Sequence, residues 1–110
     1  MRLGSASGIE TTGYTCVAST IGASSVGSAS STAGFLIDVS AAANSATGML
    51  VLDQITTNTW ICAGQNIVAA TSTSLTTGSK TVAATLDRVR LTTVGGTDTF
   101  DAGTINIFYE

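Results

Sequence analysis

Polar and apolar residues alternate along several short stretches of this chain, and a period of two is the pattern of half-buried β-strands. The alternation is clearest near the C-terminus, in residues 88–92 and in the first four residues of 104–109. The one helix-leaning spot, residues 41–43, is too short to form a helix alone. The strands that we expect are residues 14–19, 34–39, 49–53, 59–64, 88–92 and 104–109, with one or two weaker strands in 66–76 and 80–85 around Gly78.

Turn chemistry separates these strands. Residues 94–98 contain two glycines that can take positive φ, so the two C-terminal strands are expected to form a hairpin that ties down the end of the chain. A second hairpin is expected across residues 54–58. Residues 49–53 are apolar on both faces, which predicts a central strand or a strand buried at a subunit contact. The Gly/Ser/Ala-rich segments 21–33 and 40–47 are interpreted as loops.

Short strands separated by turns predict an all-β fold, and 110 residues suit one domain with one core. We expect a jelly-roll-like β-sandwich of about seven or eight antiparallel strands. It would span residues 12–110 and follow an N-terminal arm, residues 1–11. The chain has no proline and only 10% charged residues, so exposed sheet edges would be an aggregation hazard. A homo-oligomer that buries these edges is therefore expected.

The composition disfavours several functional classes. Without any histidine, Ser/His/Asp and Cys/His catalytic sets are impossible, and no Gly-rich phosphate loop is present, so we expect neither an enzyme nor a cofactor. The cations are Arg2, Lys80, Arg88 and Arg90, too few for a nucleic-acid partner bound by phosphate neutralisation. The sequence has neither the long apolar run of a membrane span nor the apolar core of a signal peptide, so we expect no membrane partner.

The two cysteines, Cys16 and Cys62, stand in strand-like contexts. They are interpreted as small buried hydrophobic residues, although a disulfide between neighbouring strands is an alternative. Such a bond seldom forms in a protein assembled in a reducing cytoplasm. Because the chain lacks histidine and a CxxC pair, we expect no zinc site.

Charged and aromatic residues of the C-terminal block are candidates for an interface. Asp98 and Asp101 stand in a turn, where they more often bond backbone amides than bind calcium. Ion pairs between these carboxylates and Arg88 or Arg90 would fix register and partner choice at a subunit interface. The candidate interface residues are Asp87, Arg88, Arg90, Asp98, Asp101, Phe108 and Tyr109.

Trp60 is the only tryptophan and faces one side of its expected strand. We interpret it as a core residue, which is the more common role of a lone tryptophan on a sheet. The alternative is an exposed platform on which a sugar ring stacks, with Gln54 and Asn58 close by in sequence to bind its hydroxyl groups.

Two segments carry a resemblance to a known group of proteins. SGIETTGYTCVAS, residues 7–19, and LDRVRLTTVGGTDTFDAGTINIFYE, residues 86–110, cover about a third of the chain. Both resemble small β-rich virion proteins of tailed bacteriophages, particularly those of cyanobacterial and other aquatic phages. Similar endings occur in that group on capsid decoration (cement) proteins and at the tips of fibre-like proteins. The resemblance concerns a structural module and supplies no catalytic residue.

The resemblance implies a homotrimer that decorates the outside of a phage head, contacts the major capsid protein and stabilises capsomer contacts. Such a protein would be made in the host cytoplasm and reside on the virion. The alternative is a receptor-binding tip of a fibre or tail that recognises host surface glycan. The start at Met1 without a shaft favours decoration as the expectation. Docking is expected through the N-terminal arm and the loops 21–33 and 40–47.

Overall fold

The computed structural model describes residues 1–37, 41 and 43–109. These residues form a compact all-β domain of eight antiparallel strands in two sheets, and no helix occurs among them. The predicted all-β class and the number of strands are thus confirmed. The strands are β1 (Arg2–Ser5), β2 (Gly8–Ile9), β3 (Tyr14–Gly22), β4 (Val26–Ser31), β5 (Ala46–Thr56), β6 (Thr59–Val68), β7 (Ser72–Thr81) and β8 (Arg88–Arg90).

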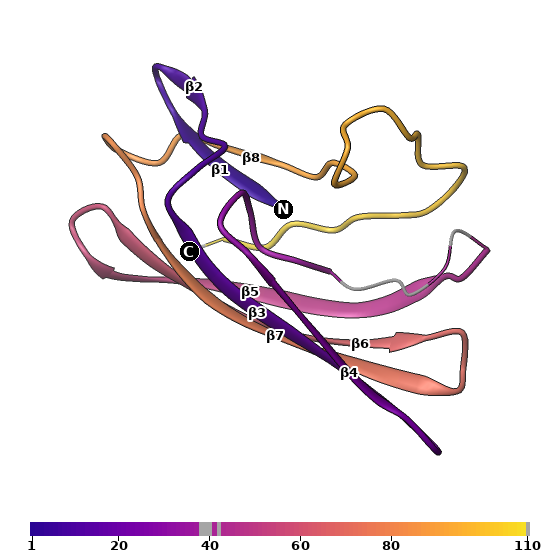
Figure 1. The fold of residues 1–110 in the computed structure, drawn as a ribbon. Coiled ribbons are helices and arrows are strands. Elements are labelled where there is room, and N and C mark those ends of the chain that lie inside the picture. The colour runs from indigo at the N-terminus through magenta and orange to yellow at the C-terminus, as the bar shows by residue number, and fades with distance from the viewer. Residues whose placement is uncertain (38–40, 42, 110) are drawn as a thin grey trace.

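The larger sheet has five strands in the order β4-β3-β7-β6-β5 (Figure 1). Strands β5, β6 and β7 follow one another as hairpins, and β3 and β4 form a separate hairpin. The two hairpin units join where β3 pairs with β7, from Tyr14 opposite Lys80 to Gly22 opposite Ser72. Strands β4 and β5 therefore form the two edges of this sheet.

The smaller sheet has three strands in the order β2-β1-β8 and lies toward one end of the larger one (Figure 1). Residues 1–11, expected as an arm, instead supply β1 and β2. Leu3 is fully buried in the core, and the N-terminal amine donates a hydrogen bond to Phe35 O. The N-terminus is thus an integral part of the fold, because β1 has a partner strand on each side and an apolar residue beneath it.

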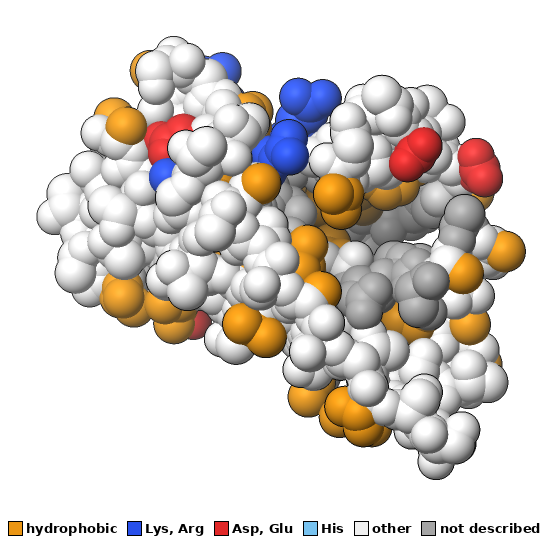
Figure 2. Space-filling view, in the orientation of Figure 1, with side chains coloured by type: hydrophobic (Ala, Val, Ile, Leu, Met, Phe, Trp, Pro, Cys, Tyr) orange, Lys and Arg blue, Asp and Glu red, His pale blue; other side chains and the backbone are white. Residues whose placement is uncertain are grey.

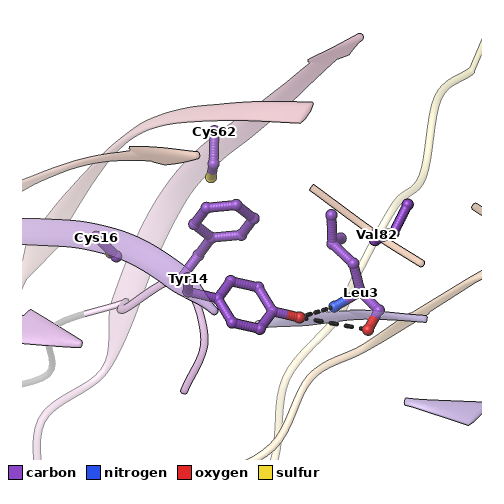
Figure 3. Close-up of a cluster of buried hydrophobic side chains, with 6 residues drawn as sticks. Leu3, Tyr14, Cys16, Cys62 and Val82 are labelled. Carbon is purple, nitrogen blue, oxygen red and sulfur yellow. Dashed lines mark hydrogen bonds between the residues drawn. The ribbon is translucent and has the colours of Figure 1, made fainter. Parts of the chain in front are cut away.

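The core lies between the two sheets and centres on Tyr14 and Phe35, whose rings meet edge to face with centroids 5.1 Å apart (Figure 3). The Tyr14 hydroxyl accepts a hydrogen bond from Leu3 N at 2.6 Å and lies 3.1 Å from Glu10 O. The hydroxyl is therefore buried, and its hydrogen bonds are made within the protein. Leu3, Tyr14, Cys16, Phe35, Cys62 and Val82 form the buried cluster.

Gly78 shapes this core because Phe35 lies against it. A Cβ atom built on Gly78 would come within 3.0 Å of Phe35 Cδ1 and within 2.4 Å of Thr15 O. The absence of a side chain at Gly78 therefore leaves room for the ring. Residue 35 was expected in a strand, residues 34–39, but residues 34–37 form no strand and instead cross the sheet face. Leu36 N donates to Cys16 Sγ, and Leu36 O accepts from Thr76 Oγ1 at 2.8 Å. Residues 38 and 39 lie outside the described residues.

Four other expectations about the elements require correction or extension. The segment 21–33 is not a single loop, since it contains β4. Strand β5 lies at an edge of the sheet, so the prediction of a central strand for residues 49–53 is wrong. The expected hairpin with residues 59–64 is confirmed, and its strands extend further than predicted. Gly78 does not interrupt β7, which runs unbroken past it. Part of the expected loop 40–47 lies outside the described residues.

The C-terminal hairpin is absent from the described part of the chain. Strand β8 covers residues 88–90 and pairs with β1, whereas residues 104–109 form no strand and are exposed. The expected turn is present in part: Gly96 has φ of 72° and donates from its N to Thr93 O at 3.2 Å. Strand β8 pairs with the N-terminal strand β1 on one side, and none of the described pairings joins its other side to residues 104–109.

Candidate functional site

The most exposed apolar segment is the C-terminal segment, defined here as residues 91–109. It contains Phe100, Ile105, Ile107, Phe108 and Tyr109, whose side chains are 65–93% exposed. None of the described strand pairings includes this segment, and Figure 1 draws it as a long trace without arrows. Residues 104–109 nevertheless keep the alternating pattern of a strand. The segment thus offers apolar side chains and unpaired backbone to a partner.

The charged candidates precede this segment or lie within it, and they do not form the ion pairs expected across a hairpin. Arg88 donates two hydrogen bonds to its neighbour Asp87, at 2.6 and 3.0 Å. These bonds lower the pKa of the Asp87 carboxyl and raise that of the Arg88 guanidinium. Both side chains are solvent-exposed, so the pair contributes little to stability.

The other charged candidates make no ion pair across a hairpin. Arg90 is exposed and stands opposite Arg2 in the pairing of β8 with β1. Asp98 and Asp101 are exposed, and the described ion pairs involve other residues. Asp98 O accepts a hydrogen bond from Thr93 Oγ1 at 3.3 Å. Within residues 1–37, 41 and 43–109, no cluster of three or more acidic, cysteine or histidine side chains could hold a metal ion.

Trp60 is half-buried and packs against the core cluster, with its indole Nε1 shielded from solvent. Gln54 is exposed and donates a hydrogen bond to Thr57 O. Asn58 stands in the β5–β6 turn, where its O accepts from Val82 N at 2.9 Å. This geometry favours the core role of Trp60, because an inward-facing ring presents little surface for a sugar to stack on.

Cys16 and Cys62 face the same core and stand on either side of Gly78, each directly opposite it in its strand pairing. Two strand spacings place their Cα atoms about 10 Å apart. A disulfide needs a Cα separation below about 7 Å, so both thiols remain free and the disulfide alternative is wrong. Burial raises the pKa of the Cys62 thiol to about 11, which leaves it protonated and unreactive at neutral pH.

The most buried ion pair joins Lys80 of β7 to Glu10, beneath the small sheet. Lys80 is only 7% exposed, and its Nζ lies 5.3 Å from the Tyr14 ring centroid. Glu10 also accepts from Ala83 N at 2.8 Å, and this bond together with Lys80 lowers the pKa of the Glu10 carboxyl. The ion pair joins Glu10 to β7, and the bond from Ala83 N joins it to the residues after β7. Together they hold the N-terminal residues onto β7.

Sequence reasoning did not identify a second exposed apolar surface: the face of the five-stranded sheet that points away from the core. We call it the outer face. Its apolar side chains are 37–77% exposed, and they are Val17, Ile21, Val26, Met49, Val51, Ile61, Ile67 and Leu75. The strand registers place them on one side of the sheet. Figure 2 shows hydrophobic side chains along its lower margin, over this sheet.

The signal for the outer face was present in the sequence. Residues 49–53 are apolar on both faces, and the alternative interpretation was a subunit contact. The side chains on β3 and β7 were harder to find. Each is a lone apolar residue among Ser and Thr, and only the register shows that they meet.

No helix of the described chain is long and apolar enough to span a membrane. Comparison of the chain with protein-family models, with curated proteins and with solved structures finds no match in any of the three. The functional argument therefore rests on the surfaces described above.

Proposed function

We propose that this chain is a structural protein of a bacteriophage virion, a decoration or cement protein that binds the outside of the head. The observation that carries the proposal is the C-terminal segment, with five large apolar side chains held in solvent. The segment also lies within residues 86–110, the longer of the two stretches that resemble phage virion proteins. In this proposal the protein binds the major capsid protein.

The segment suits attachment to a shell subunit by strand addition. Residues 104–109 have the alternation of a strand but no partner in the described pairings, so their backbone N–H and C=O groups can pair with an open sheet edge. Ile105 and Ile107 would then face one side and Phe108 the other. The charges of Asp98 and Asp101, at the base of residues 104–109, would select the partner rather than add much affinity.

Binding of this kind stabilises a head by mass action. A protein that binds the assembled shell and not the dissociated subunits lowers the free energy of the assembled state. Contacts to neighbouring capsomers would add to this effect. The jelly-roll-like architecture and the three copies that the resemblance implies belong to the same proposal.

Two measurements test the proposal. The first is the copy number of this protein in purified particles relative to the main shell subunit. A comparable number supports decoration; a handful of copies indicates a fibre or tail tip that binds glycan, and complete absence would refute a virion role.

The second measurement is rebinding of purified protein to heads that lack it. The variant Ile105→Ser/Phe108→Ser should bind weakly and fail to restore heat tolerance, whereas Asn106→Ala should behave as the natural chain. Asn106 lies between the two apolar positions and is a matched control for a change in the same segment. Equal rebinding of both variants would show that the segment is not the attachment surface.

A further inference from the structure

The outer face carries eight large, exposed apolar side chains among Ser and Thr residues, and none of the described residues covers them. On the core side, the five-stranded sheet already packs against the small sheet and residues 33–37. On the outer side, rows of paired residues place apolar side chains of β3, β5 and β6 on either side of threonines of β7. One row joins Val51 through Ala63 and Thr77 to Val17, and another joins Ile67 through Thr73 to Ile21. An antiparallel sheet commonly leaves one face in water, but a large exposed apolar patch on that face marks an interaction site.

The area of this face matches one side of a stable protein interface. Strands β3, β5, β6 and β7 have 9, 11, 10 and 10 residues. With β4, which has 6 residues, the five strands, spaced about 4.8 Å apart with a rise of about 3.3 Å per residue, span roughly 730 Å². A standard interface buries about 800 Å² on each partner.

The charge of the face indicates what kind of partner fits. Among the residues of the five strands, only Asp53 and Lys80 are charged. Lys80 points into the core, so Asp53 is the only charge on the outer face. A partner needs an equally uncharged, flat and apolar surface, because burying an unpaired charge against this face is costly. A second copy of the same face meets this requirement except at Asp53, which lies on the edge strand β5 and therefore at the margin of the contact.

We propose that two copies of this chain associate through their outer faces, stacked sheet on sheet about a two-fold axis. The side chains of the two faces would interdigitate as in a β-sandwich, with the sheets about 10 Å apart. Strand β7 is the middle strand, so Leu75 lies near the centre of the contact. This contact is self-complementary and closes after two copies. It leaves the C-terminal segment of each copy available to another partner.

The test uses the purified full chain with no phage particle present, so its result does not depend on binding to a head. A pair of copies would replace the three copies that the resemblance implies, and attachment through the C-terminal segment would be unaffected. Sedimentation velocity should give a mass of two chains, each of 11.0 kDa, at concentrations well above micromolar. Leu75→Lys should raise the dissociation constant at least about tenfold, because both copies place the new charge near the axis. Val94→Lys makes a similar change at an 84% exposed position outside the strands and should leave the mass unchanged.

Folding of each variant is checked through the buried thiols, which should resist Ellman's reagent until the protein unfolds. If Leu75→Lys fails this check, Ile67→Lys on β6 takes its place, since Ile67 is 56% exposed on the same face. Dissociation by the folded face variant and not by Val94→Lys supports the proposal. A single-chain mass at all concentrations, a three-chain mass, or equal behaviour of the face and control variants would overturn it.

Discussion

Replacing Gly78 by alanine tests the packing of the core most directly. A Cβ atom at this position would lie 2.4 Å from Thr15 O and 3.0 Å from Phe35 Cδ1. The first of these atoms belongs to the backbone of β3, so a rotamer change cannot relieve the clash. Strand β3 must therefore separate from β7, and the Phe35 ring must also shift away from residue 78. Overpacking of this kind costs about 1–3 kcal/mol, and the backbone contact places the expected cost near 3 kcal/mol.

Gly27→Ala is the matched control because Gly27 also lies within a strand of the same sheet. A Cβ atom there meets no atom within 4 Å. Since glycine in a strand is about 0.5–1 kcal/mol less favourable than alanine, this variant should be neutral or slightly stabilised. The two variants should therefore differ by about 3–4 kcal/mol in the free energy of unfolding.

Urea unfolding followed by Trp60 fluorescence measures this difference. All proteins are compared at one concentration, because self-association adds to apparent stability. The two glycine variants could instead have free energies of unfolding within about 1 kcal/mol of each other. That result would refute the argument that Phe35 can pack against residue 78 only when this residue is glycine.

Three further predictions concern the buried polar groups and thiols. Tyr14→Phe removes the acceptor of buried Leu3 N and should cost about 1–3 kcal/mol in urea unfolding, whereas Tyr109→Phe, at a 92% exposed residue, should change stability by less than about 0.5 kcal/mol. The pKa of Glu10 lies below its ordinary value of 4.5, so the stability that Glu10 contributes is complete above pH 4.5 and is lost as pH falls through the lowered pKa. The free energy of unfolding of Glu10→Gln should therefore depend less on pH in that acidic range. An unchanged pH dependence would contradict the stabilising role of the Glu10 carboxylate. Both thiols are buried, and burial also raises the pKa of Cys62 to about 11, so Ellman's reagent at pH 8 should label neither thiol of the folded chain and both thiols of the unfolded chain. Rapid labelling of the folded chain would contradict the described core.

The elements that could be predicted are those rich in β-branched, aromatic and other apolar residues. Residues 14–19 and 59–64 are such cases, and both became parts of longer strands. Strand β4 and most of β7 were missed or interrupted because Ser, Thr, Gly and Ala provide almost no hydropathy contrast between the two faces. Their strand conformation comes from pairing with β3, which local sequence does not encode.

At the candidate site, a strand-like sequence pattern did not lead to a strand. Residues 104–109 have good strand alternation but no partner in the described chain, and the pattern alone cannot supply one. Phe35 was assigned to a strand for its apolar neighbours, yet its position is decided by the space above Gly78, far away in sequence. The outer face depends in the same way on registers between distant strands.

The pairing of β3 with β7 has a consequence for the order of folding. It joins residue 14 to residue 80, whereas β5, β6 and β7 are joined by short turns. The local hairpins therefore form first, and the loss of chain entropy on closing the long loop delays the docking of the β3–β4 hairpin. Until that step, β7 has an open edge and the core lacks Tyr14 and Cys16. Pulsed thiol labelling during refolding should accordingly find Cys16 protected no earlier than Cys62, and the chain is most exposed to misassembly in the interval before the sheet closes.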